Sequence, residues 1–534
     1  MKPTNIRLED TNYFSSLMLD YINREENTLS LYNRFPTKEA YFEQAEEKLN
    51  SYQHRDILVK QLTKQMSELD LSKKQKKNLA LLSEKNTVTI TTGHQLNLFT
   101  GPIFFFYKIL QIIKQCKELN KKQDKINFVP IFWMATEDHD FEEINHFKYQ
   151  DRIIHWEHKS GGPVGRFCTQ GLKEVFDSFL SLIPNGKKKD ALKVLIDNSY
   201  NSSQNLAEAT RKLVHLLFKD YGLLLLDGDD PQLKKLMIPI FEKEIIEQKS
   251  FELVNKQSEL LAKHQYKIQV HPREINLFFI GENYSRERIV FENGFYYVLN
   301  TDYKFTQEEI LLELNNNPEK FSPNVILRPV YQESILPNVA YIGGGGEIAY
   351  WLELKTMFEH YQISFPLLVL RNSLLFRTKK QFNKQLALNL RDEHLFDNSL
   401  IISKEKVNEE SKLTRQLPQL KADLEKIFKE LEQISTQTDL TFSDMVSAQR
   451  TKQLKGFGKL EQRLVKAEMK KNQDYQNRVD ELLKSMNQNS KLQERTVNFS
   501  DFDFLDLTLF IEEIYKSIQP FDFNFIINTL DESI

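Results

Sequence analysis

Polar residues that could do chemistry gather at two places where an apolar, strand-like run ends. The first is Thr92-Gly93-His94-Gln95, which follows the β-branched run 86–92. Gly93 would let a ligand approach the backbone, and His94 could donate a hydrogen bond to a phosphate or to a developing negative charge. An ordinary tight turn that caps the following helix explains the same residues equally well.

The second place is Glu137-Asp138-His139-Asp140, four ionisable residues in a row after the apolar run 126–133. Packing like charges together destabilises a fold unless a cation or hydrogen-bond donors compensate them. A substrate amine, a Mg²⁺ ion or work as a general base would each account for the cluster. The alternative is a solvated helix start with acidic capping residues. The position at the end of an apolar strand favours a functional role.

Glycine is scarce, with 17 in the 534-residue chain, yet four stand together at Gly343–Gly346, followed by Glu347, Tyr350 and Trp351. A glycine run costs folding entropy, so a backbone role is expected: an anion or nucleotide lying against it, or a flexible lid. No Gly-Lys-Ser/Thr follows, and the Gly-x-Gly-x-x-Gly pattern is missing, which excludes two nucleotide-binding fingerprints. A flexible surface loop is the alternative, although an apolar strand and a helix flank the run.

The remaining candidate residues give weaker signals. Arg328 could clamp a carboxylate or phosphate, or could form a buried salt bridge. His139 and His146 have a spacing that would suit a metal, but no cysteine stands near enough for a thiolate zinc site, so we predict no metal site and no zinc. Cys116, in an apolar helix, and Cys168, in an insertion, are not expected to be nucleophiles.

The elements that must position these residues form an alternating pattern of apolar runs and helical segments. Such βαβ units build an α/β fold with a parallel sheet, and sites lie at the carboxyl ends of its strands. A helix from Ile103 to about Leu119 would connect the first two strands. Both polar clusters fall at such strand ends. The predicted strands are 86–92, 126–133, 223–227, 339–342 and 367–370.

Two insertions are expected to interrupt this α/β core. Residues 146–167 and 268–299 have the pattern of antiparallel strands, and Asn293-Gly294 predicts a tight turn within the second. We therefore expect residues 1–378 to form the core with N-terminal helices. Its insertions would cover about 146–220 and 265–320.

The composition changes after about Lys379 to Lys, Gln, Glu and Leu. Apolar residues at three- and four-residue spacing predict two long amphipathic helices joined near Ser435–Ser443, which would make an antiparallel coiled-coil arm over 379–490. A two-stranded arm buries little by itself, so we expect it to pack on another subunit. Residues 491–534 are expected to be mostly helical, broken at Pro520, and to return to the core.

The overall composition excludes several classes of protein. With 72 Lys+Arg and 75 Asp+Glu, the formal net charge is −3, which argues against nucleic-acid binding. Hydrophobic residues make up 40 %, enough for large cores. Two cysteines exclude a disulfide scaffold and favour a cytoplasmic protein. We expect no secretory signal and no membrane span, because residues 1–23 are charged and the apolar stretch Leu96–Tyr107 is too short.

Five segments match, in the right order, the motifs of one known family. Thr92 to Pro102 is similar to Thr-Gly-Gln-Gln…Leu-Leu-Thr-Gly-Pro, and Phe132 to His146 to Phe-Trp-x-Ala-x-Glu-Asp-His-Asp-Phe-x-Glu-Ile-Asn-His. Ser322–Pro329, Ala340–Trp351 and Leu492–Arg495 also match. The sequence therefore resembles the bacillithiol biosynthesis cysteine-adding enzyme, from about residue 90 to 498. It departs from the family at His94, where glutamine is common, and at Gly345, where proline is common.

The resemblance implies a Rossmann-like parallel-sheet core, resembling class I nucleotidyltransferases, with a coiled-coil domain and a homodimeric assembly. The implied reaction joins the carboxyl group of cysteine to the amine of glucosaminyl-malate, as the last step of bacillithiol biosynthesis. Amide formation from a free carboxylate is uphill in water, so ATP with Mg²⁺ is the expected cofactor. The expected partners are these small substrates, with no nucleic acid and no membrane.

The site residues expected on this interpretation come from all three motifs. The expected catalytic residues are His94, Glu137, Asp138, His139 and Asp140. The expected nucleotide- and substrate-binding residues are Thr92, Gly93, Gln95, Asn97, Thr100, Gly101, Asn145, Arg328, Gly343, Gly344, Gly345, Gly346, Glu347, Tyr350 and Trp351. A rival hypothesis is a non-catalytic coiled-coil scaffold with a degenerate nucleotide site. A tRNA synthetase is a third, weaker one, since no basic tRNA-binding domain is evident from the charge.

Overall fold

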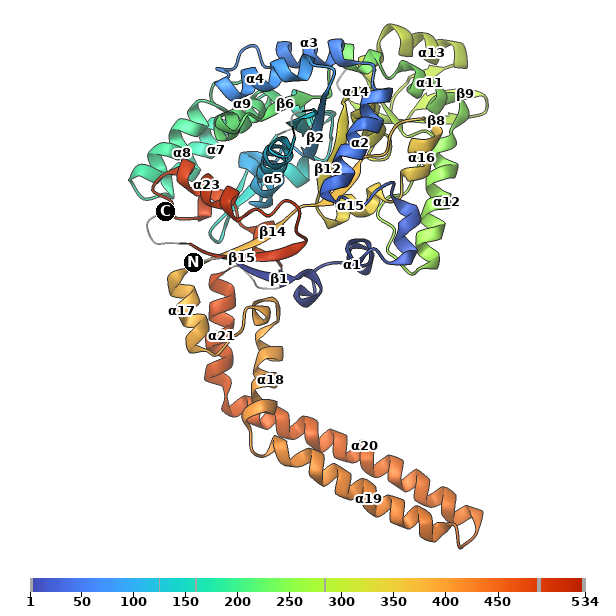
Figure 1. Ribbon diagram of the computed structural model, residues 1–534, viewed down its shortest axis with the longest axis vertical. Helices are drawn as coiled ribbons and strands as arrows, with labels where there is room; N and C mark the ends of the chain where they lie inside the picture. Colours follow the sequence, from blue (N-terminus) through green and yellow to red (C-terminus); the bar gives the residue numbers. More distant parts are fainter. Residues whose placement is uncertain (1–2, 124, 159–160, 283–284, 487–490, 531–534) are drawn as a thin grey trace. The chain divides into compact units, whose positions relative to one another are not determined.

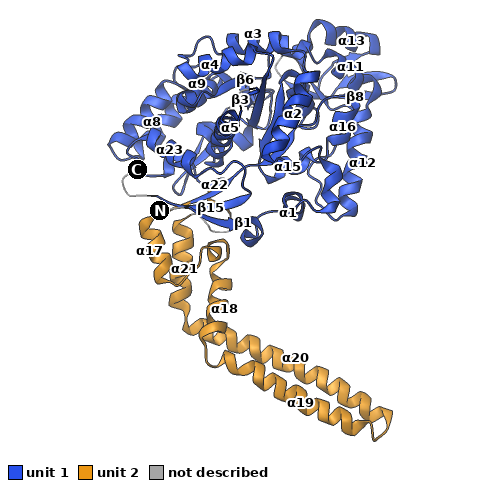
Figure 2. Ribbon diagram, in the orientation of Figure 1, with its two compact units in different colours: residues 1–375, 494–534 blue, residues 376–493 orange. Residues whose placement is uncertain are grey.

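The chain divides into two compact units in the computed structural model (Figure 2). Unit 1 holds Met1–Leu375 and Glu494–Ile534, and unit 2 holds Phe376–Gln493. The structure describes residues 3–123, 125–158, 161–282, 285–486 and 491–530. Positions 487–490 of the predicted arm and 531–534 of the predicted C-terminal segment lie outside the described residues.

The core of unit 1 is a five-stranded parallel sheet in the order β13-β12-β2-β3-β6 (Figure 1). The predicted α/β fold with a parallel sheet is thereby confirmed. The order reverses between β2 and β12, and parallel sheets bind ligands at such a switch point. The strands are β2 (Thr87–His94), β3 (Asn127–Met134), β6 (Leu224–Asp227), β12 (Asn338–Gly343) and β13 (Leu367–Leu370).

Helices pack on this sheet from several parts of the chain. The predicted connecting helix is α5 (Phe104–Asn120), which is apolar on most sides and contacts β2, β3 and α23 (Leu507–Ser517). The other helices described in the N-terminal half of the unit are α1 (Ser16–Asn23), α2 (Lys38–Ser51), α3 (Arg55–Gln65), α4 (Lys73–Ser83), α6 (Phe141–Ile144), α7 (Leu172–Ser181), α8 (Lys187–Asp197), α9 (Leu206–Phe218), α10 (Pro231–Lys235), α11 (Ile238–Glu247) and α12 (Lys249–Lys263). Further along lie α13 (Gln307–Asn316), α14 (Leu327–Ile335), α15 (Gly345–Trp351) and α16 (Lys355–His360).

The second insertion forms an antiparallel sheet in the order β10-β9-β8-β7-β11. Asn293 and Gly294 have φ values of 51° and 82°, so the predicted tight turn is confirmed. The described part of the first insertion forms a short hairpin, β4 (His146–Tyr149) with β5 (Arg152–His155), and continues mainly as helices. The strands of the second insertion are β7 (Leu277–Ile280), β8 (Arg286–Glu292), β9 (Phe295–Val298), β10 (Lys304–Phe305) and β11 (Phe321–Pro323).

The C-terminal segment differs from the prediction of a mostly helical end. Helix α23 is followed, after Pro520, by strand β15 (Asn524–Leu530). This strand pairs antiparallel with β1 (Thr4–Arg7) and also neighbours β14 (Ser373–Thr378). Its apolar residues are compatible with a strand as well as with a helix. The strand forms because the distant N-terminal segment hydrogen-bonds to it.

Unit 2 is helical (Figure 2). Helices α19 (Leu417–Ser435) and α20 (Leu440–Lys471) pack on each other, so the hairpin predicted to turn near Ser435–Ser443 is confirmed. The second helix is shorter than predicted, because the chain breaks at Asn472 and continues as a separate helix, α21 (Gln473–Ser485), which contacts α18 (Ser399–Glu410). The unit also holds α17 (Lys379–Ala387), and α22 (Gln493–Thr496) leads back to unit 1. Among the described helices of the chain, none combines the length and apolar character that crossing a membrane requires.

Candidate active site at the carboxyl edge of the parallel sheet

A cavity of about 710 Å³ opens in unit 1 where β2, β3 and β12 end. We call the residues at and after these strand ends, together with Arg328, Arg371 and Arg495, the core wall. The insertion wall comes from the segment that leads into β7 and from β7 and β8; its polar members are His271, Arg273, Arg286 and Arg288. The cavity therefore lies at the switch point of the sheet, where the fold favours ligand binding.

Members of all three predicted motifs meet at this cavity. Asp138 and Gly344, for example, lie far apart in the sequence but on the same lining. The predicted site residues that line the cavity are Gly93, His94, Gln95, Glu137, Asp138, His139, Arg328, Gly344, Gly346, Glu347 and Tyr350.

Four predicted site residues near β12 shape the wall without lining the cavity. The hydroxyl of Thr92 donates to the carbonyl of Ile342 at 2.7 Å and ties β2 to β12. A Cβ on Gly343 would lie 2.9 Å from that of Glu347, and one on Gly345 would face Met18 of α1. The glycine run is thus a strand–helix junction rather than a surface loop. Trp351 is buried and stacks on Tyr341 with ring centroids 4.5 Å apart.

The other five predicted residues that do not line the cavity belong to two neighbouring turns. Thr100 and Gly101 have φ values of 69° and 61°, in the turn before α5, and a Cβ on Gly101 would lie 2.8 Å from that of Asn97. Asn145 is buried, and its carbonyl accepts from the backbone of Trp156 at 2.8 Å. The fifth, at the start of α6, is the exposed Asp140. These residues hold the loops that carry the cavity lining.

His94 faces the cavity as a neutral imidazole. Its ring packs against Phe104 and Phe105, with centroids 5.3 and 5.2 Å away, and its Nε2 is buried without a hydrogen-bond partner among the described residues. Burial, with a smaller contribution from Lys108, lowers the pKa of His94 to about 3. At neutral pH His94 can therefore donate one hydrogen bond to a ligand but contributes no positive charge.

Lys108 and Glu347 form an ion pair that joins the interior to the core wall, with Lys108 buried at 2 % exposure and Glu347 31 % exposed at the cavity. The Lys108 ammonium donates to both carboxylate oxygens of Glu347, at 2.9 and 2.8 Å, and to the carbonyl of Gly93 at 2.5 Å. Glu347 also accepts from the hydroxyl of Tyr341 and from the backbone of Gly344, each at 2.8 Å. Burial opposes its charge, but Lys108 and these donors outweigh burial and lower the pKa of Glu347 to about 2. The pair fixes β2 against the glycine junction.

Arg371 is held by a second buried carboxylate. It makes a two-point ion pair with Glu494, at 2.8 and 2.6 Å, and the two side chains are only 4 % and 1 % exposed. The Nε of Arg371 has no partner among the described residues and lies near Gly344. The next residue, Arg495, also lines the cavity, and burial together with the charge of Arg371 lowers its pKa. A free N–H therefore remains available to an anion on this side.

Arg328 lies on the core wall without a carboxylate partner among the described residues. Its guanidinium donates to the hydroxyl of Tyr350 at 2.7 Å and to the amide oxygen of Gln332 at 3.0 Å. Of the two roles that the sequence allowed, a carboxylate or phosphate clamp fits this geometry better than a buried salt bridge.

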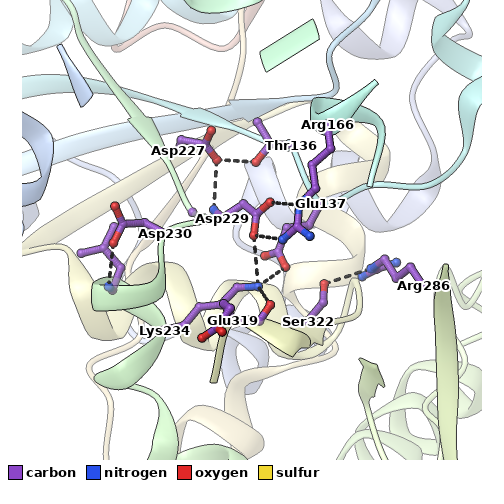
Figure 3. Close-up of polar contacts among 12 residues, drawn as sticks. Thr136, Glu137, Arg166, Asp227, Asp229, Asp230, Lys234, Arg286, Glu319 and Ser322 are labelled. Carbon is purple, nitrogen blue, oxygen red and sulfur yellow. Dashed lines mark hydrogen bonds and ion pairs between the residues drawn. The ribbon is translucent and has the colours of Figure 1, made fainter. Parts of the chain in front are cut away.

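Glu137, which follows β3, belongs to a compensated charge network (Figure 3). Lys234, whose side chain is fully buried, donates to Glu137 at 2.5 Å and lies 3.4 Å from Asp229. Arg166 makes a two-point contact with Asp229, at 2.8 and 2.9 Å. Burial raises the pKa of Glu137, and the charge of Lys234 opposes that effect. Glu137 is thus already paired with Lys234 at the strand end, and its catalytic role stays a prediction.

Asp138 is held only by neutral donors. One carboxylate oxygen accepts from the side-chain amide of Gln95 at 2.8 Å, and the other accepts from the backbone of His139 at 2.7 Å and of Asp140 at 3.3 Å. The carboxylate is therefore oriented but keeps its negative charge free for a ligand. It is the best-placed acceptor for an amine or ammonium group on the core wall.

Contact with Arg286 sets the protonation of His139. Nη1 of Arg286 lies 2.8 Å from Nδ1 of the imidazole. Because a guanidinium can only donate, Nδ1 accepts, and the hydrogen of the neutral ring is on Nε2. Burial and the positive charge of Arg286 lower the pKa of His139. We therefore assign His139 as a hydrogen-bond donor through Nε2, and not as a general base.

Comparison with known families covers both units. Residues 1–372 match the N-terminal Rossmann-like domain of the bacillithiol biosynthesis family BshC, and residues 374–530 match its C-terminal coiled-coil domain. The chain belongs to the BshC family. Its role is accordingly in bacillithiol biosynthesis, and its parallel-sheet unit is a Rossmann-like domain.

Relatives from several bacteria match along nearly the whole length of this BshC protein. A protein of Flavobacterium johnsoniae named "Putative cysteine ligase BshC" is 44 % identical, over 99 % of this chain and 100 % of that protein. The one from Cytophaga hutchinsonii, with the same name, is 37 % identical over 97 % of both chains. The one from Staphylococcus carnosus is 29 % identical over 77 % of this chain and 79 % of its own.

Solved structures give a much weaker likeness. A "putative arginyl tRNA synthetase" from Campylobacter jejuni shares 10 % identity, over 83 % of this chain and 96 % of that chain, with a TM-score of 0.21. A likeness at this level does not bear on the fold. The expected resemblance of this BshC protein to class I nucleotidyltransferases therefore stays a prediction.

Several charged residues of the BshC cavity were missed in the sequence. Lys108, which pairs with the lining residue Glu347, stands in the most apolar part of helix α5, ahead of Lys114 and Lys117. Arg371 directly follows the last parallel strand, so both residues had a local signal. Arg286 and Arg288 alternate on one strand, which is the spacing of a shared strand face. Within the described residues, no three His, Cys, Asp or Glu side chains are arranged to hold a metal ion.

Proposed function

We propose that this BshC protein is an ATP-driven ligase that joins the carboxyl group of cysteine to the amine of glucosaminyl-malate, as the last step of bacillithiol biosynthesis. The name of the relatives supports the cysteine ligase part of this proposal. The observation that carries it is one cavity that offers both anion donors and, at Asp138, an uncompensated carboxylate for an amine.

The anion-binding part of the proposal rests on donors that lack a partner. Nε2 of His94 and Nε of Arg371 are buried atoms without a hydrogen-bond partner among the described residues, and both belong to residues that line the cavity. A Cβ on Gly346 would meet no atom within 4 Å, so the backbone there is open to a bulky group. These features fit the phosphates of ATP, which supplies the energy for amide formation.

Magnesium fits the cavity as an ion that arrives with the nucleotide. Mg²⁺ keeps several waters and usually takes one or two protein carboxylates together with phosphates. Among the described residues, the hydrogen bonds that hold the carboxylate of Asp138 all come from neutral donors, so this carboxylate is the one of the core wall that could face such an ion.

The amine part of the proposal assigns acceptor and donor roles to two neighbouring residues. Asp138 would accept the hydrogen of the ammonium group and leave the amine lone pair free to attack the activated carboxyl group. His139, whose hydrogen is on Nε2, would donate to an oxygen of the substrate. Gln95 keeps Asp138 in place through its amide, at 2.8 Å.

The ligase proposal is tested by incubating the purified full-length protein with cysteine, glucosaminyl-malate and Mg-ATP. Bacillithiol should form with the consumption of one ATP per amide. Leaving out any one of the three should abolish the product. A failure to form bacillithiol over a range of pH, salt and protein concentration would contradict the ligase assignment.

The scaffold hypothesis makes a different prediction in cells. Replacing Asp138 and His139 by alanine should abolish bacillithiol if the cavity is catalytic. Unchanged bacillithiol in cells that contain the folded double variant would favour a scaffold instead.

We also propose that the protein acts as a homodimer in the cytoplasm. Leucine and isoleucine side chains of α19 and α20 are exposed in the single chain, for example Leu420 at 52 %, Ile434 at 56 % and Leu460 at 61 %. Burying such side chains would stabilise an assembly of two arms. Light scattering of the full-length protein should give twice the chain mass of 63.1 kDa. A monomer at micromolar concentration would contradict the dimer.

A further inference from the structure

We propose that the insertion wall is a carboxylate-binding subsite in which Arg273, Arg286 and Arg288 hold the dicarboxylate end of the amine substrate. This inference rests on the proposed function and adds to it a location for the malate part of glucosaminyl-malate. It leaves the core wall to the nucleotide, to the cysteine that becomes activated and, at Asp138, to the amine.

The first support is the way strand β8 presents its arginines. Arg286 and Arg288 are two residues apart on this strand, so their side chains leave from the same face of the sheet. Phe278 of β7 pairs with Arg288 and lies under the guanidinium of Arg286, whose Cζ is 3.9 Å from the ring centroid. Arg273 adds a third guanidinium from the segment before β7, and all four side chains line the cavity.

The second support is that these arginines make no close ion pair among the described residues, although Glu137, Asp138 and Asp229 lie near enough to Arg286 to favour its charge. The partners of Arg286 are the hydroxyl of Ser322, the carbonyl of Pro323 and the imidazole of His139, at 2.9, 2.9 and 2.8 Å, and all of them are neutral. Arg286 is nevertheless buried, with only 8 % of its surface exposed. Among the described residues, none of the three arginines forms an ion pair, and the buried Nε of Arg288 has no hydrogen-bond partner. Buried cations are normally paired, so the buried Arg286, with the partly buried Arg288 beside it, points to an anionic ligand.

The third support is the position of this face beside the proposed amine acceptor. Arg286 touches His139, and His139 directly follows Asp138. An amine bound at Asp138 would therefore place carboxylates of the same molecule toward β8. Guanidinium groups match carboxylates with two parallel hydrogen bonds, which gives both affinity and orientation. Phosphates fit the core wall better, because the open backbone of the glycine junction lies there.

Equilibrium binding to the full-length protein tests the subsite without requiring turnover. Titration calorimetry would measure the dissociation constants of glucosaminyl-malate and of Mg-ATP for the wild type, for Arg288→Ala and for Glu287→Ala. Glu287 is a matched control, since it is the next residue on β8, does not line the cavity and accepts from Asn300 at 3.0 Å. We expect Arg288→Ala to weaken glucosaminyl-malate about 10- to 100-fold. Glu287→Ala should change the dissociation constant of glucosaminyl-malate less than about twofold. Neither variant should change the dissociation constant of Mg-ATP by more than about twofold.

A second probe shows which part of the ligand the arginine contacts. Methyl glucosaminide has the amine and the sugar but no carboxylate, so Arg288→Ala should bind it as the wild type does. Equal weakening of both ligands would overturn the proposal, and so would a larger loss for Mg-ATP than for glucosaminyl-malate. If Arg288→Ala does not fold, the exposed Arg273 gives a second variant, Arg273→Ala, with the same expected direction.

The outcomes for the subsite and for the proposed function are separable. A wild type that binds glucosaminyl-malate through Arg288 but forms no bacillithiol would refute the ligase and keep the subsite. A wild type that forms bacillithiol while Arg288→Ala binds glucosaminyl-malate normally would refute the subsite and keep the ligase.

Discussion

The two walls of the cavity carry similar charges in opposite circumstances. At the core wall, the buried Lys108 is paired with Glu347, and Arg371 is paired with Glu494 in a contact that is buried on both sides. On the insertion wall, the hydrogen bonds of Arg286 go to neutral groups. The buried Nε of Arg288 has no hydrogen-bond partner among the described residues. The difference indicates that the paired charges of Lys108 and Arg371 hold the core wall in shape, even though Nε of Arg371 stays open to an anion, whereas the charges of the insertion wall are available to a ligand.

This comparison has an energetic basis. Burying an ion costs several kcal/mol, and a well-placed counter-ion offsets that cost only in the folded state. Removing one member of a compensated pair therefore destabilises the fold. Removing an uncompensated cation relieves a cost, and its loss is felt only when a ligand binds. The predictions below test this distinction, beginning with the largest expected effect.

Glu494→Gln should cause the largest loss of stability. The substitution keeps the shape but leaves Arg371 buried without its counter-charge, so we expect the free energy of unfolding to fall by about 3–5 kcal/mol. Chemical denaturation measures this change. The matched control is Glu481→Gln, which removes an exposed partner of Lys384 at 3.2 Å and should cost less than about 1 kcal/mol. Equal losses of unfolding free energy in the two variants would contradict the view that the buried Arg371–Glu494 pair holds the core wall in shape.

Asp138→Asn should lower kcat about 100-fold, which corresponds to about 2.7 kcal/mol in the activation barrier. The reason is that an amide cannot take up the proton that the ammonium group must lose. The measurement is the rate of bacillithiol formation at saturating substrates. Asp140→Asn is the control, since Asp140 is exposed and does not line the cavity. If the two variants lose activity equally, the assignment of Asp138 is wrong.

His94→Gln should flatten the dependence of stability on pH. The pKa of His94 is about 3 in the folded chain and about 6.5 when it is unfolded, so the unfolded state binds the extra proton as the pH falls. Stability from this group is therefore complete above pH 6.5 and declines below it. Glu347, with a pKa of about 2, is ionised in the folded state throughout this range.

From pH 7 to pH 5, the wild type should lose about 2 kcal/mol more of its unfolding free energy than His94→Gln does. Denaturation curves at several pH values provide the measurement. Parallel pH profiles of the two proteins would mean that His94 titrates normally and that the core wall is less buried than the structure shows.

The smallest effect is expected for the stability of Arg288→Ala. No carboxylate among the described residues depends on this arginine, so the free energy of unfolding should change by less than about 1 kcal/mol. The same denaturation experiment gives the value without any ligand. A loss as large as that of Glu494→Gln would show that the insertion wall is structural, and would end the contrast between the two walls.

The strands and the site loops were largely predictable from the sequence. Apolar and β-branched runs such as 86–92 and 126–133 are typical of buried strands. Because these strands are parallel, the motifs that follow them lie at the same edge of the sheet. Gly93, Asp138 and Glu347 were identified for this reason. Residues such as Asn97 and Asn145 were selected with the same motifs but support the loops, because the motif pattern does not tell which side of a turn faces the cavity.

By itself, then, the sequence determined the parallel sheet, the helical hairpin and the strand ends that carry the chemistry, because these follow from local periodicity and turn residues. Only the tertiary structure decided which charges are paired, since Lys108 meets Glu347 across 239 positions and Arg371 meets Glu494 across 123. It likewise decided that 524–530 is a strand, through pairing with residues 4–7. Partners so far apart leave no local pattern, and their contacts exist only after the chain has folded.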